Sequence, residues 1–260
     1  MSKALNNFKK YRFLLAELIK KDIKLKYRSS YLGILWTLLE PILTTIVLTV
    51  VFSGLYNKGD ATFPVYIITG RLLYSLFSNA TKAAMKSIRS NSAMIKKVYV
   101  PKYMYPFSSV LSNYVTFLIS LIIIFGAMLV FKVEPTLYLF EAIIPLFLIL
   151  VLSLGVGMIL ATMAVFFRDL EYLWGVLLML IMYTCAIFYK PNMLNLDLST
   201  YGWVFRINPL YNIIVNFRNS VFGLPLDNEA LLISAIFSFG SLLIGVLLFY
   251  KKQDEFILNI

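Results

Sequence analysis

Two long stretches without a charged residue constrain the fold of this 260-residue chain more than any other feature. They run from Tyr103 to Phe131 and from Ala142 to Phe167. Each exceeds the roughly 20 residues that an α-helix needs to cross about 30 Å of hydrocarbon. Backbone amides and carbonyls cannot stay unpaired in lipid, so runs of this length must be helical. The sequence therefore predicts an all-α integral membrane protein.

Composition and hydropathy extend this prediction to the whole chain. Hydrophobic residues make up 60% of it and charged residues 14%, whereas soluble domains carry about 45–50% and about 25%. We predict a single transmembrane domain, 1–260, with an amphipathic segment at 1–30 and a six-helix membrane-spanning unit at 31–260. The predicted spans are 34–56, 63–81, 106–131, 142–167, 172–189 and 230–250. The second is the weakest because it contains Arg71.

The distribution of lysine and arginine predicts the orientation. Eighteen lie on one predicted side, in the first 30 residues, between Lys82 and Lys102, at Arg168 and in the C-terminal tail. The opposite side has five, which are Lys58, Lys132, Lys190, Arg206 and Arg218. The positive-inside rule therefore places both termini in the cytoplasm. Topology and anionic lipid also explain the net charge of +11, so no nucleic-acid partner is expected.

Three segments outside the spans carry structural patterns. In residues 1–30 one helical face is apolar and another is rich in lysine, which is typical of a helix lying in the membrane surface. This helix serves either as a topology anchor or as a docking element. Between Lys82 and Pro106 we expect a short cytoplasmic helix followed by an irregular re-entry, since Pro101 and Pro106 break helices. The run 207–215 is too short to span the bilayer, which favours a re-entrant helix over a packed surface loop.

Motifs for chemistry are missing from the sequence. It has no phosphate-binding loop of the G-x-x-x-x-G-K-[ST] type and no histidine, and its single cysteine, Cys185, lies in an apolar run. We therefore expect no enzyme, no metal site and no cofactor bound by this chain. Charged residues inside the spans are also few, which argues against an ion relay. If the protein moves a substrate uphill, another subunit supplies the energy.

Four segments together resemble a known family. They are KYRSSYLGILWTLLEP from Lys26, SIRSNSAMIKKVYVPKYMYP from Ser87, FFRDLEYLW from Phe166 and INPLYNIIVNFRNSVFG from Ile207. In this order they resemble the ABC-type export permeases for polysaccharides, which include O-antigen, capsule and teichoic-acid exporters. The resemblance covers nearly the whole chain.

The resemblance implies a bacterial plasma-membrane homodimer that works with two ATPase chains, which hold ATP and Mg, and exports a lipid-linked polymer. It implies an interface helix over residues 8–26 and outer re-entrant helices at Asn208 and Pro209. It also implies contacts with the ATPase at a coupling helix and at the next cytoplasmic turn. The residues in these two places are Ser87, Ile88, Arg89, Asn91, Ser92, Met94, Ile95, Lys96, Arg168 and Asp169.

Several of these residues also have simpler interpretations. Tyr27, Arg28 and Trp36, at the predicted entry, are equally typical of membrane-interface anchors. Asn91 with Ser92 fits a helix cap, and Arg168 with Asp169 fits an ion pair at a tight turn.

Two charged residues within spans, Glu40 and Arg71, are candidates for the transport pathway. Glu40 precedes Pro41 in an apolar span and needs a partner or water. Arg71 lies at a different depth, so we expect no direct bridge to Glu40. Alternatively, Arg71 snorkels to the outer headgroups.

Three other functions remain open from the sequence. They are a related ABC permease for a drug, peptide or lipid, a non-transporting membrane scaffold, and an ion-coupled transporter. The last is disfavoured by the scarcity of intramembrane charge and by the lack of evident inverted repeats.

Overall fold

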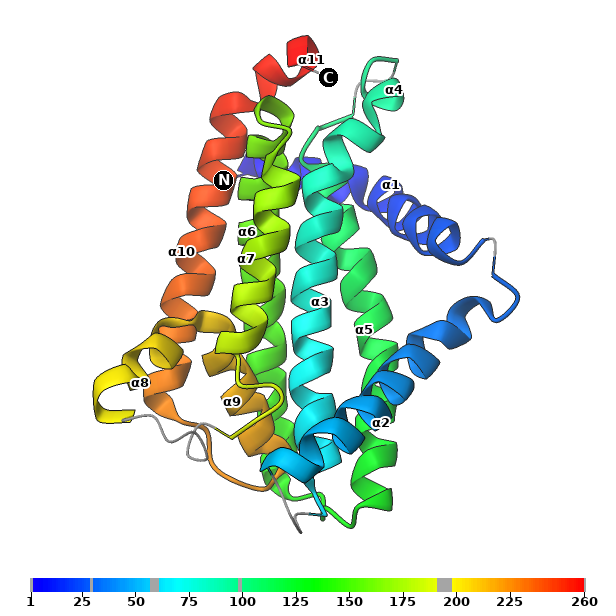
Figure 1. The fold of residues 1–260 in the computed structure, drawn as a ribbon. Helices are drawn as coiled ribbons and strands as arrows, with labels where there is room; N and C mark the ends of the chain where they lie inside the picture. Colours follow the sequence, from blue (N-terminus) through cyan, green and yellow to red (C-terminus); the bar gives the residue numbers. More distant parts are fainter. Residues whose placement is uncertain (1, 29, 57–60, 98–99, 191–197, 260) are drawn as a thin grey trace.

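A computed structural model describes residues 2–28, 30–56, 61–97, 100–190 and 198–259. Within these ranges the chain is helical and contains no strand, and most of the helices form one elongated bundle (Figure 1). The elements are α1 (Ser2–Tyr27), η1 (Gly33–Leu35), α2 (Trp36–Tyr56), α3 (Phe63–Ser90), α4 (Ser92–Ile95), α5 (Met104–Val130), η2 (Leu137–Ala142), α6 (Ile143–Phe166), α7 (Leu170–Thr184), α8 (Leu198–Ile207), α9 (Pro209–Val221), α10 (Asn228–Lys252), η4 (Gln253–Glu255) and α11 (Phe256–Asn259).

Four segments of the described chain are long and apolar enough to cross a membrane: Gly33–Phe52, Met104–Val130, Leu137–Phe166 and Asn228–Glu255. The predicted count of six spans is therefore confirmed only in part. α7 has 15 residues, which at about 1.5 Å per residue falls short of about 30 Å of hydrocarbon. α3 is long enough but too polar.

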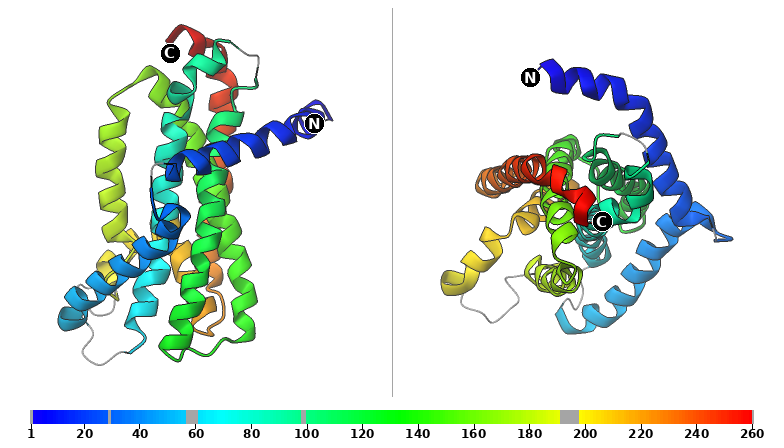
Figure 2. Two further views of the ribbon diagram at one scale, coloured as in Figure 1. Left: turned by 90° about the vertical axis from the view of Figure 1, so that its right-hand side faces the viewer. Right: turned by 90° about the horizontal axis from the view of Figure 1, so that it is seen from above.

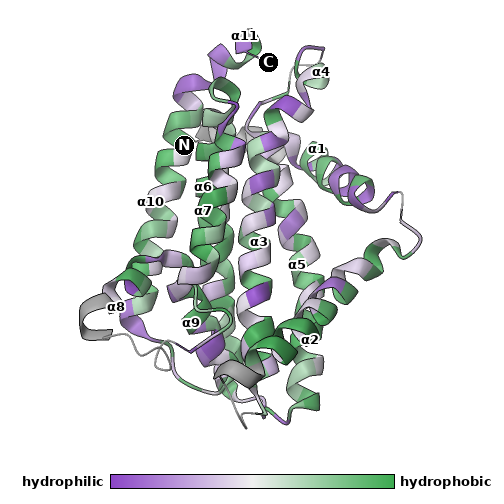
Figure 3. Ribbon diagram, in the orientation of Figure 1, coloured by the Kyte–Doolittle hydropathy of each residue, from purple (hydrophilic) through white to green (hydrophobic). Residues whose placement is uncertain are grey.

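The polarity of α3 follows from its position. It packs between α5 and α6 along most of its length (Figure 1). Coloured by hydropathy, α3 is mixed while α2 and α6 are mostly apolar (Figure 3). Its side chains contact protein, so it buries hydroxyls such as those of Thr69 and Thr81, which donate to carbonyls one turn earlier, at Val65 and Phe77. A helix covered by neighbours does not need an apolar surface.

Small residues bring α6 and α10 close together. A Cβ atom at Gly155 of α6 would overlap the backbone at Leu242 of α10, and one at Gly245 would lie 2.6 Å from the Gly155 carbonyl oxygen. Membrane helices use glycine in this way to let two backbones approach each other.

α1 and α2 form a hairpin beside this bundle. α1 crosses the outside of the bundle toward the end that carries α4 and packs on α5, and α2 returns obliquely across α3 and α5 (Figures 1 and 2). On the predicted apolar face of α1, Leu15 and Leu18 are buried. On the predicted lysine-rich face, Lys20 and Lys24 are exposed. The amphipathic pattern therefore identifies the face that contacts the bundle. The side chain of Phe8, from the same predicted face, lies outside the described part.

The cytoplasmic segment differs from its prediction. Instead of a separate short helix, α3 continues to Ser90 and is followed by the single turn α4. Nothing between Thr81 and Ser90 stops a helix, and Ala83, Ala84 and Met85 favour one. Pro106 does not break a helix either. It lies in the first turn of α5, where its missing N–H has no intrahelical acceptor to lose.

The predicted outer re-entrant run is divided between two helices. α8 ends at Ile207 and α9 begins at Pro209. Between them the Asn208 Oδ1 accepts hydrogen bonds from the backbone N–H groups of Leu210 and Tyr211, which is a helix N-cap followed by proline at the first position. α9 packs against α10, α6 and α3. The run is thus neither a span nor a loose loop.

Candidate functional site

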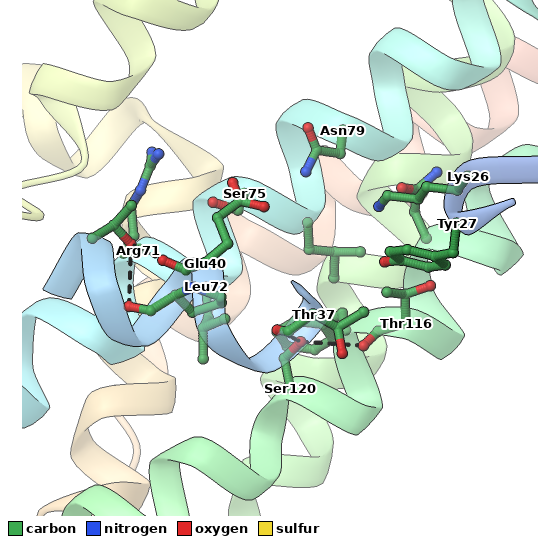
Figure 4. Close-up of a pocket in the computed structure, with 15 residues that line it drawn as sticks. Lys26, Tyr27, Thr37, Glu40, Arg71, Leu72, Ser75, Asn79, Thr116 and Ser120 are labelled. Carbon is green, nitrogen blue, oxygen red and sulfur yellow. Dashed lines mark hydrogen bonds between the residues drawn. The ribbon is translucent and has the colours of Figure 1, made fainter. Parts of the chain in front are cut away.

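A polar cleft separates the α1–α2 hairpin from α3 and α5 (Figure 4). It consists of a cavity of about 540 Å³ and an adjoining one of about 70 Å³. The two share Lys26, Glu40, Asn79, Asn113 and Thr116 as lining residues. Such polar groups between apolar spans are costly unless they serve a substrate or a partner. We take this cleft as the candidate site.

The floor of the cleft is built around a proline in α2. Pro41 has no N–H to donate to the carbonyl one turn earlier, that of Thr37. That carbonyl instead accepts a hydrogen bond from the Ser120 hydroxyl of α5 at 3.0 Å. The Thr44 hydroxyl in turn donates to the Glu40 carbonyl at 2.8 Å. The carbonyl that Pro41 leaves without a backbone donor therefore forms a hydrogen bond that joins α2 to α5.

The charged residues of the cleft are three cations, Lys26, Arg71 and Lys86, and two carboxylates, Asp22 and Glu40. As expected from the sequence, no ion pair joins Glu40 to Arg71 within the described residues. The Arg71 guanidinium lies 5.8 Å from the centre of the Tyr74 ring. Lys86 also pairs with Glu171 at 3.1 Å, so Lys26 and Arg71 are the cations that a negatively charged group can approach.

The three predicted entry residues differ in position. Tyr27, the last residue of α1, lines the cleft, and the Lys26 ammonium lies 5.7 Å from its ring centre. Arg28 is exposed beyond the end of α1. Trp36 begins α2 and is 41% exposed. Only Tyr27 of the three belongs to the site.

Asn91 joins the predicted coupling segment to the hairpin. Its Nδ2 donates to the Ser87 carbonyl at 2.8 Å and closes the end of α3, while its Oδ1 accepts from the Lys21 ammonium of α1 at 2.8 Å. The Asn91 side chain therefore closes the end of α3 and makes no side-chain cap hydrogen bond to α4, and it contacts a residue 70 positions away in the sequence. In α4, Ile95 is buried whereas Met94 is 40% exposed. Ser92 is half-buried and Lys96 is exposed.

At the turn between α6 and α7 the structure corrects the sequence interpretation. Arg168 and Asp169 are both exposed, and in the part of the chain described they form no ion pair with each other. Their neighbour Glu171 instead pairs with Lys86 at 3.1 Å and with Arg89 at 3.8 Å.

Arg89, predicted to contact a partner, is anchored inside this subunit. Besides pairing with Glu171 it donates to the Ala164 carbonyl of α6, so the end of α3 is joined to the end of α6 and the beginning of α7. Glu171 was missed from the sequence. The sequence signal that could have identified it is a carboxylate in the first turn of a helix, where a negative charge interacts favourably with the helix dipole.

At the opposite end of the bundle from α4, Asn208 links α9 to the end of α7, because its Nδ2 donates to the Thr184 hydroxyl at 3.0 Å. Pro209 is the first residue of α9, and with Asn208 it lines a separate cavity of about 490 Å³. Arg218, which the sequence analysis counted among the basic residues of the side opposite the termini, lies in helix α9 and is 5% exposed. The sequence signal that could have predicted the burial of Arg218 is the apolar face of α9, because Ile214 and Phe217 lie on the same side of the helix.

Comparison with known proteins agrees with this architecture. The family described as ABC-2 type transporter matches residues 14–222. An O-antigen export system permease protein RfbA of Klebsiella pneumoniae is 29% identical over 247 residues, which cover 94% of this chain and 93% of the relative. RfbA of Myxococcus xanthus is 27% identical, with 95% of each chain covered. The polysialic acid transport protein KpsM of Escherichia coli is 22% identical, with 98% and 99% covered. Since the family match extends over far more than half of the sequence, this membrane protein belongs to the ABC-2 type transporter family.

Proposed function

We propose that the chain is the membrane subunit of an ATP-driven exporter for a lipid-linked polysaccharide or teichoic-acid-like polymer. The relatives named above are permeases or transport proteins for O-antigen and polysialic acid, and they align over nearly their full lengths. The polar cleft beneath the α1–α2 hairpin is the observation that carries the proposal. A scaffold does not need such a cleft, whereas a permease does.

The cleft suits a substrate that is polar at one end and lipidic at the other. On its outer side α2 is apolar and exposed at positions such as Ile46 and Val50, so a lipid chain can stay in the bilayer beside it. The polar end then meets Lys26, Arg71 and the amides of Asn79 and Asn113. Because the lining carries more positive than negative charge, it favours an anionic head group.

Energy in this proposal comes from a partner ATPase, present in two copies, which binds ATP and Mg. Two copies of this chain form the polymer path between them. Both chain ends lie at the same end of the molecule as α4 (Figure 1), which supports cytoplasmic termini in a bacterial plasma membrane.

The contacts of the cytoplasmic end suggest how motion reaches the cleft. A push on α4 acts on Asn91 and so on Lys21 in α1. It also acts on the end of α3, where Arg89 is held by Glu171 and by the Ala164 carbonyl. The hairpin and the bundle are therefore both connected to the segment that faces the partner.

The test is co-purification with the ATPase encoded beside this chain, followed by ATP turnover of the assembly in lipid. Met94→Asp should lower turnover several-fold, because it places a charge on an apolar side chain at the proposed contact. Ile257→Asp is the matched control, since Ile257 is similarly exposed at 49% in α11 at the same end of the molecule. Failure to find a partner ATPase, or equal turnover for the two variants, contradicts the proposal.

A further inference from the structure

A second cavity, of about 310 Å³, lies at the outer end of the molecule and shares no residue with the cleft. The beginning of α3, helix α9 and the segment after α7 form its walls. Six of its nine lining residues carry a polar side-chain group, and two of these, Lys190 and Arg218, are cationic. None of the nine is a carboxylate. The local electrostatic potential therefore favours an anion.

Arg218 supplies a buried charge to this wall. Its guanidinium donates Nη1 to the Ala186 carbonyl and Nη2 to the Tyr66 carbonyl, both at 3.1 Å, and lies 3.5 Å from the Tyr66 ring centre. Among the described residues no carboxylate pairs with it, and its Nε is buried without a hydrogen-bond partner. Buried charges usually have a counterion, because carbonyl dipoles and a ring face offset the lost hydration only in part. An anion in the cavity would supply the missing counterion of Arg218.

The backbone around Arg218 is shaped to hold it. A Cβ atom at Gly70 would overlap Arg218 Nη2, so the guanidinium fits only beside a residue without a side chain. Ala186 has a φ of 47°, a left-handed conformation that alanine rarely adopts. That conformation presents its carbonyl to both Arg218 and the Tyr66 hydroxyl, which donates to it at 3.1 Å. A charge that only needed burial would not require such a turn.

The other walls are suited to a sugar. Tyr66, Tyr211 and Phe222 contribute rings, whose faces pack against the C–H groups of a pyranose, and the Asn219 amide can hydrogen-bond hydroxyls. A lipid chain would instead need continuous apolar walls. We propose that this cavity binds an acidic sugar unit of the exported polymer, one that carries a carboxylate or a phosphate, as it leaves the outer end. The inference rests on the proposed export function.

The test measures binding of labelled glucuronate, glucose 6-phosphate and glucose to the complete transporter in phosphatidylcholine nanodiscs, by equilibrium dialysis at low salt. We expect both acidic sugars to bind at least tenfold more tightly than glucose. Lys190→Gln should weaken acidic-sugar binding about tenfold. Arg206→Gln is the matched control, since Arg206 is an exposed outer cation paired with Glu229 at 3.3 Å and does not line the cavity. It should bind as the wild type does.

Arg218 variants give a second arm. Arg218→Lys should retain more acidic-sugar binding than Arg218→Gln, and ATP turnover of the same samples shows whether each assembly is intact. Since Lys190 is only half-buried, its variant keeps the inference testable even if Arg218 variants fail to fold.

Three results would overturn the inference. One is acidic-sugar binding that is indifferent to Lys190→Gln. Another is that inorganic phosphate binds as tightly as glucose 6-phosphate, because the aromatic rings would then contribute nothing to sugar binding. The third is loss of sugar binding in phosphatidylglycerol nanodiscs, which would identify a lipid headgroup as the occupant. Normal ATP turnover alongside any of these would leave the export proposal intact.

Discussion

α2 and α3 are neighbouring helices, but α2 is apolar and largely exposed, whereas α3 is more polar and largely buried. The apolar segment Gly33–Phe52, which covers most of α2, has a mean hydropathy of 2.0, and only 11% of its apolar window is buried. α3 is too polar to qualify as a span, yet 18 of its 28 residues are buried. The exposed apolar surface of α2 suits lipid, whereas α3 is covered by other helices and can carry polar side chains. α3 is thus the centre of the scaffold, and α2 is a loosely attached wall of the cleft.

The largest expected effect concerns the closest contact between helices. Gly155→Val should destabilise the protein by several kcal/mol or prevent folding, because the new side chain would overlap the α10 backbone. Gly126→Val in α5 is the control, since a Cβ atom there meets nothing within 4 Å. The measurement is the yield of monodisperse protein and its resistance to unfolding in detergent. Equal yields for the two variants would mean that α6 and α10 do not pack as described.

The contrast between α2 and α3 is tested directly by two alanine substitutions. Leu73→Ala, at a fully buried position in α3, should lower the free energy of unfolding by about 2–5 kcal/mol. Ile46→Ala, at a position in α2 that is 55% exposed, should change it by less than about 0.5 kcal/mol. Denaturant titration in mixed micelles measures both. Similar losses would show that α2 is held as firmly as α3.

A smaller effect is expected at the turn between α6 and α7. Glu171→Gln removes the ion pairs with Lys86 and Arg89, and these partly exposed pairs should contribute at most about 1 kcal/mol. Asp169→Asn, two residues earlier and without an ion pair in the described structure, should not change the free energy of unfolding. The same titration compares the two variants. A larger loss in the free energy of unfolding from Asp169→Asn than from Glu171→Gln would support the Arg168–Asp169 ion pair suggested by the sequence.

The smallest effect is a pH dependence at the hairpin. Burial raises the pKa of Asp22, against opposing effects of Lys21 and of a hydrogen bond from Ser109. A raised folded-state pKa means that the protonated form favours folding. Docking of α1 should therefore be strongest below the ordinary aspartate pKa and should weaken as pH rises through the folded-state value.

The change is expected to stay below about 1 kcal/mol, because the group is only half-buried. Hydrogen exchange of α1 between pH 4 and pH 7, corrected for intrinsic rates, measures it. Asp22→Asn should remove the trend, and a trend that persists in this variant must come from another group.

Hydropathy predicted most of the fold because lipid imposes it. The spans at 106–131, 142–167 and 230–250 correspond to α5, α6 and α10. The predicted span 63–81 lies within α3, but the helix continues to Ser90. The expectation that Pro106 breaks a helix was wrong, because Pro106 lies in the first turn of α5. The extension of α3 to Ser90 could have been expected from its alanines.

The site depended on contacts that a single sequence does not contain. Glu40 and Arg71 were selected from the sequence as charges within apolar spans, and the structure places both in the lining of the cleft. The pairing of Lys21 with Asn91 and of Glu171 with Lys86 joins segments 70 and 85 residues apart. The burial of Arg218 depends on the absence of a side chain at Gly70 and on the turn at Ala186, neither of which is encoded by a local pattern.

Transport of a labelled lipid-linked oligosaccharide in proteoliposomes tests the central claim most directly. The wild-type permease with its ATPase should move the sugar across the bilayer only with ATP, and Arg71→Gln should slow this at least tenfold by removing a cleft cation. Lys251→Gln, an exposed change outside the cleft, should have no effect. Translocation without the ATPase, or equal rates for the two variants, would contradict export through this cleft.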